Sequence, residues 1–139
     1  MVAIFSASTK GGGMCFAFPD VCLTPAPPAP SPIPIPYPNI GQVNSASKTS
    51  SKVKFSGKEA CTMKSELGRS SGDEPGTNKG IASGTNMDKV TWKVGVSKVK
   101  VEGSKVVRHL MMTGQNGSSA NMPAGTQVAP SQTKVIVAP

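Results

Sequence analysis

The side chains best suited to chemistry in this chain are one histidine and three cysteines: His109, Cys15, Cys22 and Cys61. A Ser-His-Asp or Cys-His catalytic site would have to use His109, because the sequence holds no other histidine and no serine lies in a nucleophile-elbow context. The adjacent pair Asp73-Glu74 lies in a Ser/Gly-rich segment, where a solvated turn is expected rather than acid-base catalysis. The sequence therefore predicts that the protein is not an enzyme.

The remaining motifs have simple structural explanations. The triplet Gly11-Gly12-Gly13 is expected to be a hinge, because no Lys-Ser/Thr pair follows it as in a phosphate-binding loop. Three cysteines without a Cys-x-x-Cys motif do not predict a disulfide framework. Their spacing also differs from that of a zinc ribbon or zinc finger.

A repeated strand motif is expected to build the scaffold. The heptapeptide SKVKFSG at 51–57 reappears as SKVKVEG at 97–103, and a weaker copy covers 133–137. Each copy alternates polar and apolar residues, which predicts a short strand with one buried face, and the first two end at a turn glycine. The predicted structural core consists of strand residues: Val53, Phe55, Trp92, Val99, Val101, Val135 and Val137.

The chain is predicted to form a single domain over 1–139 with mainly β structure and long loops. Its predicted parts are a flexible N-terminus at 1–13, a Pro-rich extended ribbon at 19–40 and repeated β units at 51–137. The ribbon carries apolar residues between its prolines, so we expect it to pack on the body in a polyproline-like conformation without ladder hydrogen bonds.

Further local predictions concern strand ends and loops. Phe16 and Phe18 have strand spacing, but Pro19 is expected to end that strand. A long irregular loop with one helical turn is expected over 64–88, and the segment 113–126 is rich in Gly, Asn and Ser.

The formal net charge is +8, which suggests a nucleic-acid partner. The lysines are dispersed, however, and one Trp with one Tyr provides no aromatic ladder for base stacking. A solvated strand face explains the charge better, and a basic binding module for nucleic acid or another acidic partner is the alternative. No segment is apolar over the length of a membrane span, and Met1 is not followed by a signal peptide.

The order of motifs resembles that of PAAR-like domains of type VI secretion and related contractile injection systems. The motifs are FAFPDVC-x-TP at 16–25, PIPYPNI at 34–40, the two Ser-Lys-Val-Lys strands, SSGDE at 70–74 and APSQTKV at 129–135. The resemblance covers about Thr9 to Val137. It implies a small, repeat-built β-cone whose broad base sits on the blunt end of a trimeric VgrG-type spike and whose point becomes the tip of the needle.

The function implied by the resemblance is that of a non-catalytic spike-tip protein. One copy would cap and sharpen each VgrG trimer and dock effector or toxin proteins, with neither a nucleic-acid partner nor a stable membrane anchor. The protein would stay in the cytoplasm before firing and then leave without a signal peptide through the injection machine.

The resemblance also implies a zinc ion near the tip, which PAAR proteins hold through histidines and a cysteine. Cys22 and His109 are the implied ligands, and Cys15 and Cys61 would complete a Cys3His set. The chain departs from the family pattern because no second histidine follows His109. The alternative is that the cysteines are small buried core residues and that His109 makes an ordinary hydrogen bond.

Overall fold

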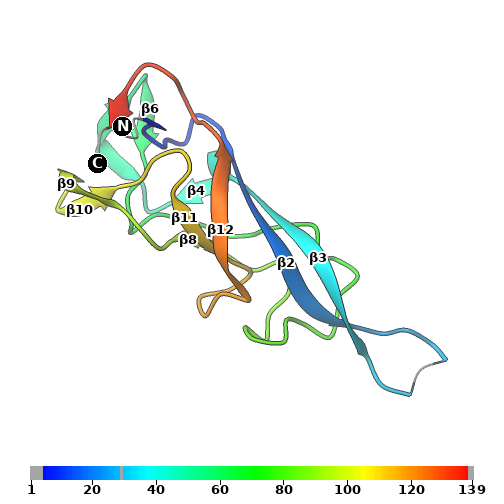
Figure 1. The fold of residues 1–139 in the computed structure, drawn as a ribbon. Coiled ribbons are helices and arrows are strands. Elements are labelled where there is room, and N and C mark those ends of the chain that lie inside the picture. The colour runs from blue at the N-terminus through cyan, green and yellow to red at the C-terminus, as the bar shows by residue number, and fades with distance from the viewer. Residues whose placement is uncertain (1–4, 29, 138–139) are drawn as a thin grey trace, which may run out of the picture.

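The computed structural model describes residues 5–28 and 30–137 as a mainly β fold, which confirms the predicted fold class (Figure 1). The strands are β1 (Phe5–Ser6), β2 (Met14–Thr24), β3 (Ile33–Gln42), β4 (Ala46–Ser47), β5 (Ser50–Phe55), β6 (Lys58–Ala60), β7 (Glu66–Leu67), β8 (Val90–Trp92), β9 (Val96–Val101), β10 (Ser104–Val106), β11 (Met112–Gln115), β12 (Met122–Ala129) and β13 (Ile136–Val137). A short 3-10 helix, η1, covers Val43–Ser45.

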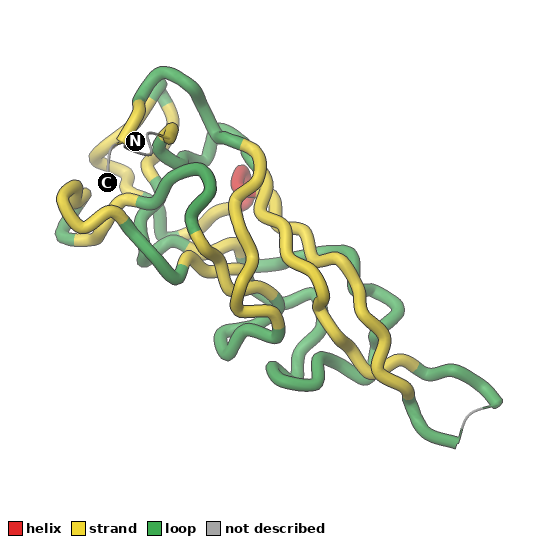
Figure 2. The backbone as a smooth tube through the Cα atoms, viewed as in Figure 1, coloured by secondary structure: helices red, strands yellow, loops and turns green. Residues whose placement is uncertain are grey.

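One antiparallel sheet of seven strands runs through the molecule in the order β3-β2-β12-β11-β8-β7-β4. Three further pairs, β5-β6, β9-β10 and β1-β13, form separate two-stranded units. These units gather at the end of the molecule where both termini lie, whereas β2 and β3 extend to the opposite, narrow end (Figures 1 and 2). The molecule therefore tapers from a broad end built by repeats to a single hairpin.

Both heptapeptide copies form β-hairpins with two-residue turns. The turn residues are Ser56 and Gly57 in one hairpin and Glu102 and Gly103 in the other, with φ values of 55°, 81°, 50° and 81°. Positive φ at both positions is the geometry of a type I′ turn, whose twist matches that of the flanking strands. The repeat in the sequence is therefore a repeat in structure.

Three segments, each beginning in one strand of a two-stranded unit, close a ring of backbone hydrogen bonds, here called the ring end: 6–10, 59–63 and 105–109. The middle residue of each segment donates its N–H to the next: Cys61 to Ser8 O at 3.0 Å, Val107 to Cys61 O at 3.4 Å and Ser8 to Val107 O at 3.0 Å. The flanking bridges repeat in the same cyclic sense, joining Thr9 to Ala60, Thr62 to Val106 and Ala7 to Arg108. The ring end is therefore pseudo-three-fold symmetric.

The hydrophobic core lies between the ring end and the large sheet. Of the residues predicted for it, Trp92, Val101 and Val137 belong to the buried cluster. The others are half-buried and pack against that cluster: Val53, Phe55, Val99 and Val135. Residues 1–4 of the predicted flexible N-terminus lie outside the described residues, but Ala7, Ser8 and Thr9 are fully buried.

The second half of the Pro-rich segment forms the β-strand β3, so the prediction of a ribbon without ladder hydrogen bonds is wrong there. β3 pairs with β2 along its length and forms the edge of the seven-stranded sheet. The Ile40 N–H points away from β2, because it donates to Ser71 O at 2.7 Å. Pro34, Pro36 and Pro38 lie an even number of positions from Ile40, so their backbone nitrogens also face away from β2. The hydrogen-bond ladder between β2 and β3 therefore loses no donor.

Pro19 does not end its strand, contrary to prediction. β2 continues through a bulge at which Phe18 and Pro19 both oppose Pro38, and such a bulge tolerates a residue without an N–H donor. The Gly/Asn/Ser-rich segment 113–126 contains most of β11 and more than half of β12.

The segment 64–88 is mostly irregular, as expected, although it includes β7. The helical turn assigned to it from the sequence is misplaced, since the described 3-10 turn lies at Val43–Ser45. Among the described residues, no helix is long and apolar enough to cross a membrane.

Candidate functional site

A buried acidic cluster lies where β2 meets the irregular loop at 68–89. Asp20 and Cys22 are two positions apart on β2, so their side chains share the buried face, and Asp73 reaches them from the loop. All three residues have no exposed surface, and their potential ligand atoms all lie within 4.8 Å of one another. Cys22 Sγ is 3.7 Å from both Asp20 Oδ1 and Asp73 Oδ2. These three residues are called the Asp20 cluster below.

Three asparagine side chains surround the carboxylate of Asp20. Asn39 Nδ2 donates to Oδ2 at 3.1 Å and Asn116 Nδ2 donates to Oδ1 at 3.1 Å. Asn121 Nδ2 also donates to Oδ1 and, at 2.9 Å, to Val21 O. Amide donors that converge on one carboxylate stabilise its negative charge. Asp20 is therefore held in place by three side chains from other parts of the chain.

The carboxyl group of Asp73 is less well satisfied. Its Oδ2 accepts a hydrogen bond from Met87 N at 3.3 Å, but its buried Oδ1 has no hydrogen-bond partner. Burial, followed by the neighbouring Asp20, raises the pKa of Asp73 to about 7. Burial and the two carboxylates likewise raise the pKa of the Cys22 thiol to about 12. Burial and neighbouring carboxylates thus oppose ionisation of Asp73 and Cys22, and a bound cation would favour their charged forms.

Glycines allow the loop to approach β2 and β3 closely. Gly72 has a φ of +116°, and a Cβ there would lie 2.3 Å from Pro38 O. A Cβ on Gly76 would lie 2.4 Å from the Cβ of Cys22. The loop that contains SSGDE is therefore shaped to carry Asp73 into the interior. Expecting Asp73 in a solvated turn was wrong, whereas the adjacent Glu74 is exposed.

The structure separates the residues that the resemblance implied as zinc ligands. Only Cys22 belongs to the Asp20 cluster. Cys15 and Cys61 lie in the hydrophobic core, where burial raises the pKa of each thiol to about 12. His109 lies at the ring end, with Nε2 3.0 Å from Val128 O and its backbone N–H donating to Ser6 O.

Reasoning from sequence missed both carboxylates of the cluster. Asp20 precedes Cys22 by two positions, and this spacing alone places both side chains on one face of a strand. The signal was hidden because the strand was expected to end at Pro19.

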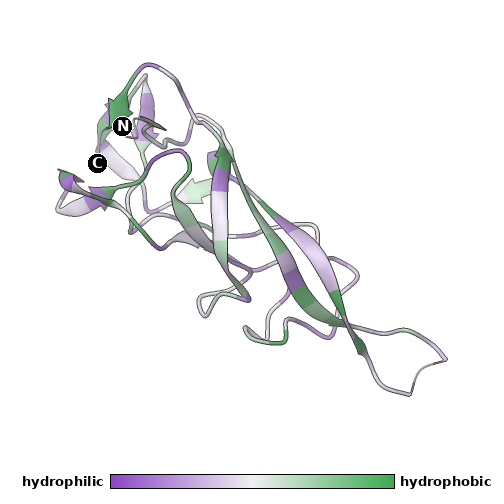
Figure 3. Ribbon diagram, in the orientation of Figure 1, coloured by the Kyte–Doolittle hydropathy of each residue, from purple (hydrophilic) through white to green (hydrophobic). Residues whose placement is uncertain are grey.

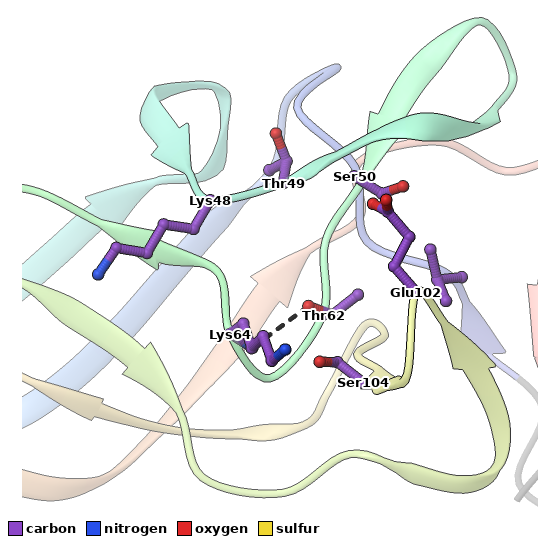
Figure 4. Close-up of a pocket in the computed structure, with 8 residues that line it drawn as sticks. Lys48, Thr49, Ser50, Thr62, Lys64, Glu102 and Ser104 are labelled. Atoms are coloured by element: carbon purple, nitrogen blue, oxygen red, sulfur yellow. Dashed lines mark hydrogen bonds between the residues drawn. The ribbon is translucent and has the colours of Figure 1, made fainter.

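A polar cavity of about 290 Å³ lies at the ring end between the two hairpins (Figure 4). It is lined by the ends of both hairpins and the adjoining turns: Lys48, Thr49, Ser50, Thr62, Lys64, Val101, Glu102 and Ser104. Lys48 Nζ turns away from it and pairs with Glu66 at 3.3 Å. The lining is rich in hydroxyl groups, which suits a hydrated contact surface better than a pocket for an apolar ligand.

Comparison with known proteins identifies two relationships. Residues 13–124 match the family described as the toxin PAAR-like domain. The chain is 40% identical over 130 residues to the DNase toxin Tse7 of Pseudomonas aeruginosa, and the alignment covers 90% of this chain and 33% of Tse7. The chain thus spans about a third of the length of the curated relative that it matches. No solved structure matches.

The relationship to Tse7 contradicts the prediction that the protein is not an enzyme, because a DNase is an enzyme. That prediction rested on the lack of a catalytic constellation around His109, in a chain that covers only 33% of the relative. The resemblance itself is confirmed. Because the match spans 13–124, most of the sequence, this chain belongs to the toxin PAAR-like domain family.

Proposed function

We propose that this chain is the spike-docking module of an effector delivered by a type VI or related contractile injection system. In this proposal the ring end sits on the blunt end of a trimeric VgrG-type spike, with one copy for each trimer. The pseudo-three-fold ring of backbone hydrogen bonds through Ser8, Cys61 and Val107 carries the proposal. The family match to a toxin PAAR-like domain supports it independently.

A three-fold acceptor presents the same contact three times around its axis. A single chain can satisfy all three contacts only if its own surface repeats with the same symmetry. The ring end repeats in this way, because the bridges of Ala7, Ala60 and Val106 recur cyclically. The three two-stranded units also leave strand edges that a partner's strands would cover.

The docking proposal is tested by coexpressing the chain with the VgrG-type spike of its own system. The expected result is a complex in which native mass spectrometry finds one chain for each spike trimer. Recovery of the spike without the chain, or of three chains for each trimer, would contradict it, since three copies would not need an internal three-fold repeat.

We also propose that the effector is a DNA-cleaving toxin, because the relative with 40% identity is a DNase toxin. The chain covers 33% of that relative, so the proposal concerns the activity of the whole natural protein. DNA would then be a substrate, in contrast to the expectation of no nucleic-acid partner. The natural full-length protein is expected to convert supercoiled plasmid to nicked or linear DNA. Intact plasmid after incubation with a range of divalent cations would refute the nuclease proposal but leave docking unaffected.

A second candidate function is that the Asp20 cluster binds a metal ion. The donor set suits a divalent cation, because a thiol and two carboxyl groups converge and Asp73 Oδ1 has no hydrogen-bond partner. Zinc is the metal that the family implies, and Asp20, Cys22 and Asp73 would hold it. Bound zinc would supply positive charge that neutralises these groups. The residues themselves would then fix the loop at 68–89 against β2.

Elemental analysis of the purified chain tests the metal site. One zinc ion for each chain is expected, and the Cys22→Ser variant should lose it. Asp88→Asn is the matched control, because Asp88 is a nearby carboxylate outside the cluster. A chain that neither retains zinc after purification nor binds added zinc in a titration would contradict the proposal.

A further inference from the structure

Three lysines occupy the same position in the three repeated units: Lys52, Lys98 and Lys134. Each is exposed, and each precedes a valine that packs against the core: Val53, Val99 and Val135. Lys52 and Lys98 alternate with these valines along β5 and β9 and so point away from the core. Lys134 lies in the bend just before β13 and is likewise exposed beside the half-buried Val135. Each unit thus carries an exposed ammonium group at this matching position.

The strand registers show that the positions two residues after these lysines are equivalent. Lys54 pairs with Glu59 in the first hairpin, Lys100 pairs with Lys105 in the second, and Ile136 pairs with Ser6 in the third unit. In each pair, the residue that follows the second member in the sequence forms a ring bridge. These residues are Ala60, Val106 and Ala7. The residues two positions before Lys54, Lys100 and Ile136 are Lys52, Lys98 and Lys134. Each unit therefore carries one lysine at the same sequence offset from its ring bridge.

The charge at this end is not balanced within the hairpins. Lys100 lies directly opposite Lys105, and like charges in this arrangement destabilise an isolated hairpin. Lys98 adds a third ammonium group to the same hairpin, where Glu102 at the turn is the one carboxylate. The ion pairs found within the described part of the chain both use Glu66, outside the hairpins. Figure 3 shows the resulting hydrophilic patches on β9 and β10.

We propose that Lys52, Lys98 and Lys134 are three equivalent contact points for an acidic, three-fold symmetric protein surface. This inference rests on the docking function proposed above and specifies its partner: each subunit of the trimeric spike places a carboxylate opposite one lysine. Charges that repeat from unit to unit around an axis suit such a surface better than a nucleic-acid backbone, which requires a continuous basic track. Electrostatic contacts of this kind set the orientation and rate of docking.

The test measures affinity for the immobilised VgrG-type spike trimer from the same system. Variants Lys52→Glu, Lys98→Glu and Lys134→Glu are made singly and together. The matched control combines Arg69→Glu, Lys79→Glu and Lys93→Glu, which changes the net charge equally at exposed positions outside the ring units. Circular dichroism verifies that each variant retains its β structure.

Each single reversal is expected to weaken binding about fivefold and the triple variant about a hundredfold, because exposed ion pairs each contribute modestly. The control variant should stay within about twofold of wild type, and wild-type affinity should fall as salt rises. If wild type binds and the triple variant binds equally well, the inference is overturned while the docking function stands. If wild type does not bind the spike at any salt concentration, both fall. If the wild type does not bind the spike but binds duplex DNA through these lysines, the nucleic-acid alternative replaces the inference.

Discussion

Replacing Asp73 by asparagine should make the stability of the fold nearly independent of pH around neutrality. Asp73 is fully buried beside Asp20, and its pKa rises from 3.8 in the unfolded chain to about 7 in the folded one. Between these values the folded state binds more protons than the unfolded state. The free energy of unfolding of the wild type therefore falls as pH rises from about 4 to about 7 and levels off above that.

The size of the effect follows from the same shift. A rise of about three pKa units corresponds to about 4 kcal/mol at most, at about 1.4 kcal/mol for each unit. Asparagine has nearly the same shape, and its amide oxygen can still accept the hydrogen bond from Met87 N. Asp73→Asn is therefore expected to raise the free energy of unfolding at pH 8 by about 2–4 kcal/mol and to change it little near pH 4.

Urea unfolding in EDTA, followed by the fluorescence of the single and buried Trp92, measures this directly. Glu74→Gln is the control, because Glu74 is the exposed neighbour and its hydrogen bond from Gly72 N needs only a side-chain oxygen. If the wild type is as stable at pH 8 as at pH 5, or if the Asp73→Asn curve runs parallel to it, Asp73 is not protonated as argued. Adding zinc should stabilise the wild type at pH 8 and not the variant, if the Asp20 cluster holds the ion.

Two further substitutions test the backbone and the packing. Gly72→Ala should destabilise the fold by about 3 kcal/mol or more, because its φ is +116° and the new Cβ would meet Pro38 O, whereas Gly68→Ala has open space and should change thermal stability little. Val107→Ala at the ring should lower the free energy of unfolding by about 2 kcal/mol, and Val94→Ala, at an exposed position, by less than about 0.5 kcal/mol. Equal losses at Val107 and Val94 in urea unfolding would contradict the assigned packing.

The hairpins at the ring end could be predicted because their signal is local. The alternation of polar and apolar residues, together with a turn pair such as Ser56-Gly57, defines both strands of a hairpin within about ten residues. The Pro-rich strand β3 could not be recognised from composition, since prolines at alternate positions suit both a polyproline ribbon and an edge strand. The partner strand decides between them, and β2 was hidden by the bulge at Pro19.

The Asp20 cluster depends on contacts that no sequence window contains. Asp20 and Asp73 lie about fifty positions apart and meet only because Gly72 and Gly76 bring the loop against β2 and β3. Asn116 and Asn121 come from a still more distant turn, in a segment whose Gly/Asn/Ser-rich composition gives no sign of burial. Buried polar residues at such meeting points resemble surface loop residues in sequence, so their burial could not be predicted.

The ring of backbone hydrogen bonds also dictates an order of folding. The hairpins can form early, because their contacts are local. The ring cannot close until the segment 6–10 meets 105–109, from nearly the other end of the chain, and such long-range contacts make folding slow. The third unit also needs β13 at Ile136–Val137 to pair with β1. A chain still emerging from the ribosome would therefore lack the closed ring, and under the docking proposed above only molecules folded through residue 137 would bind the spike.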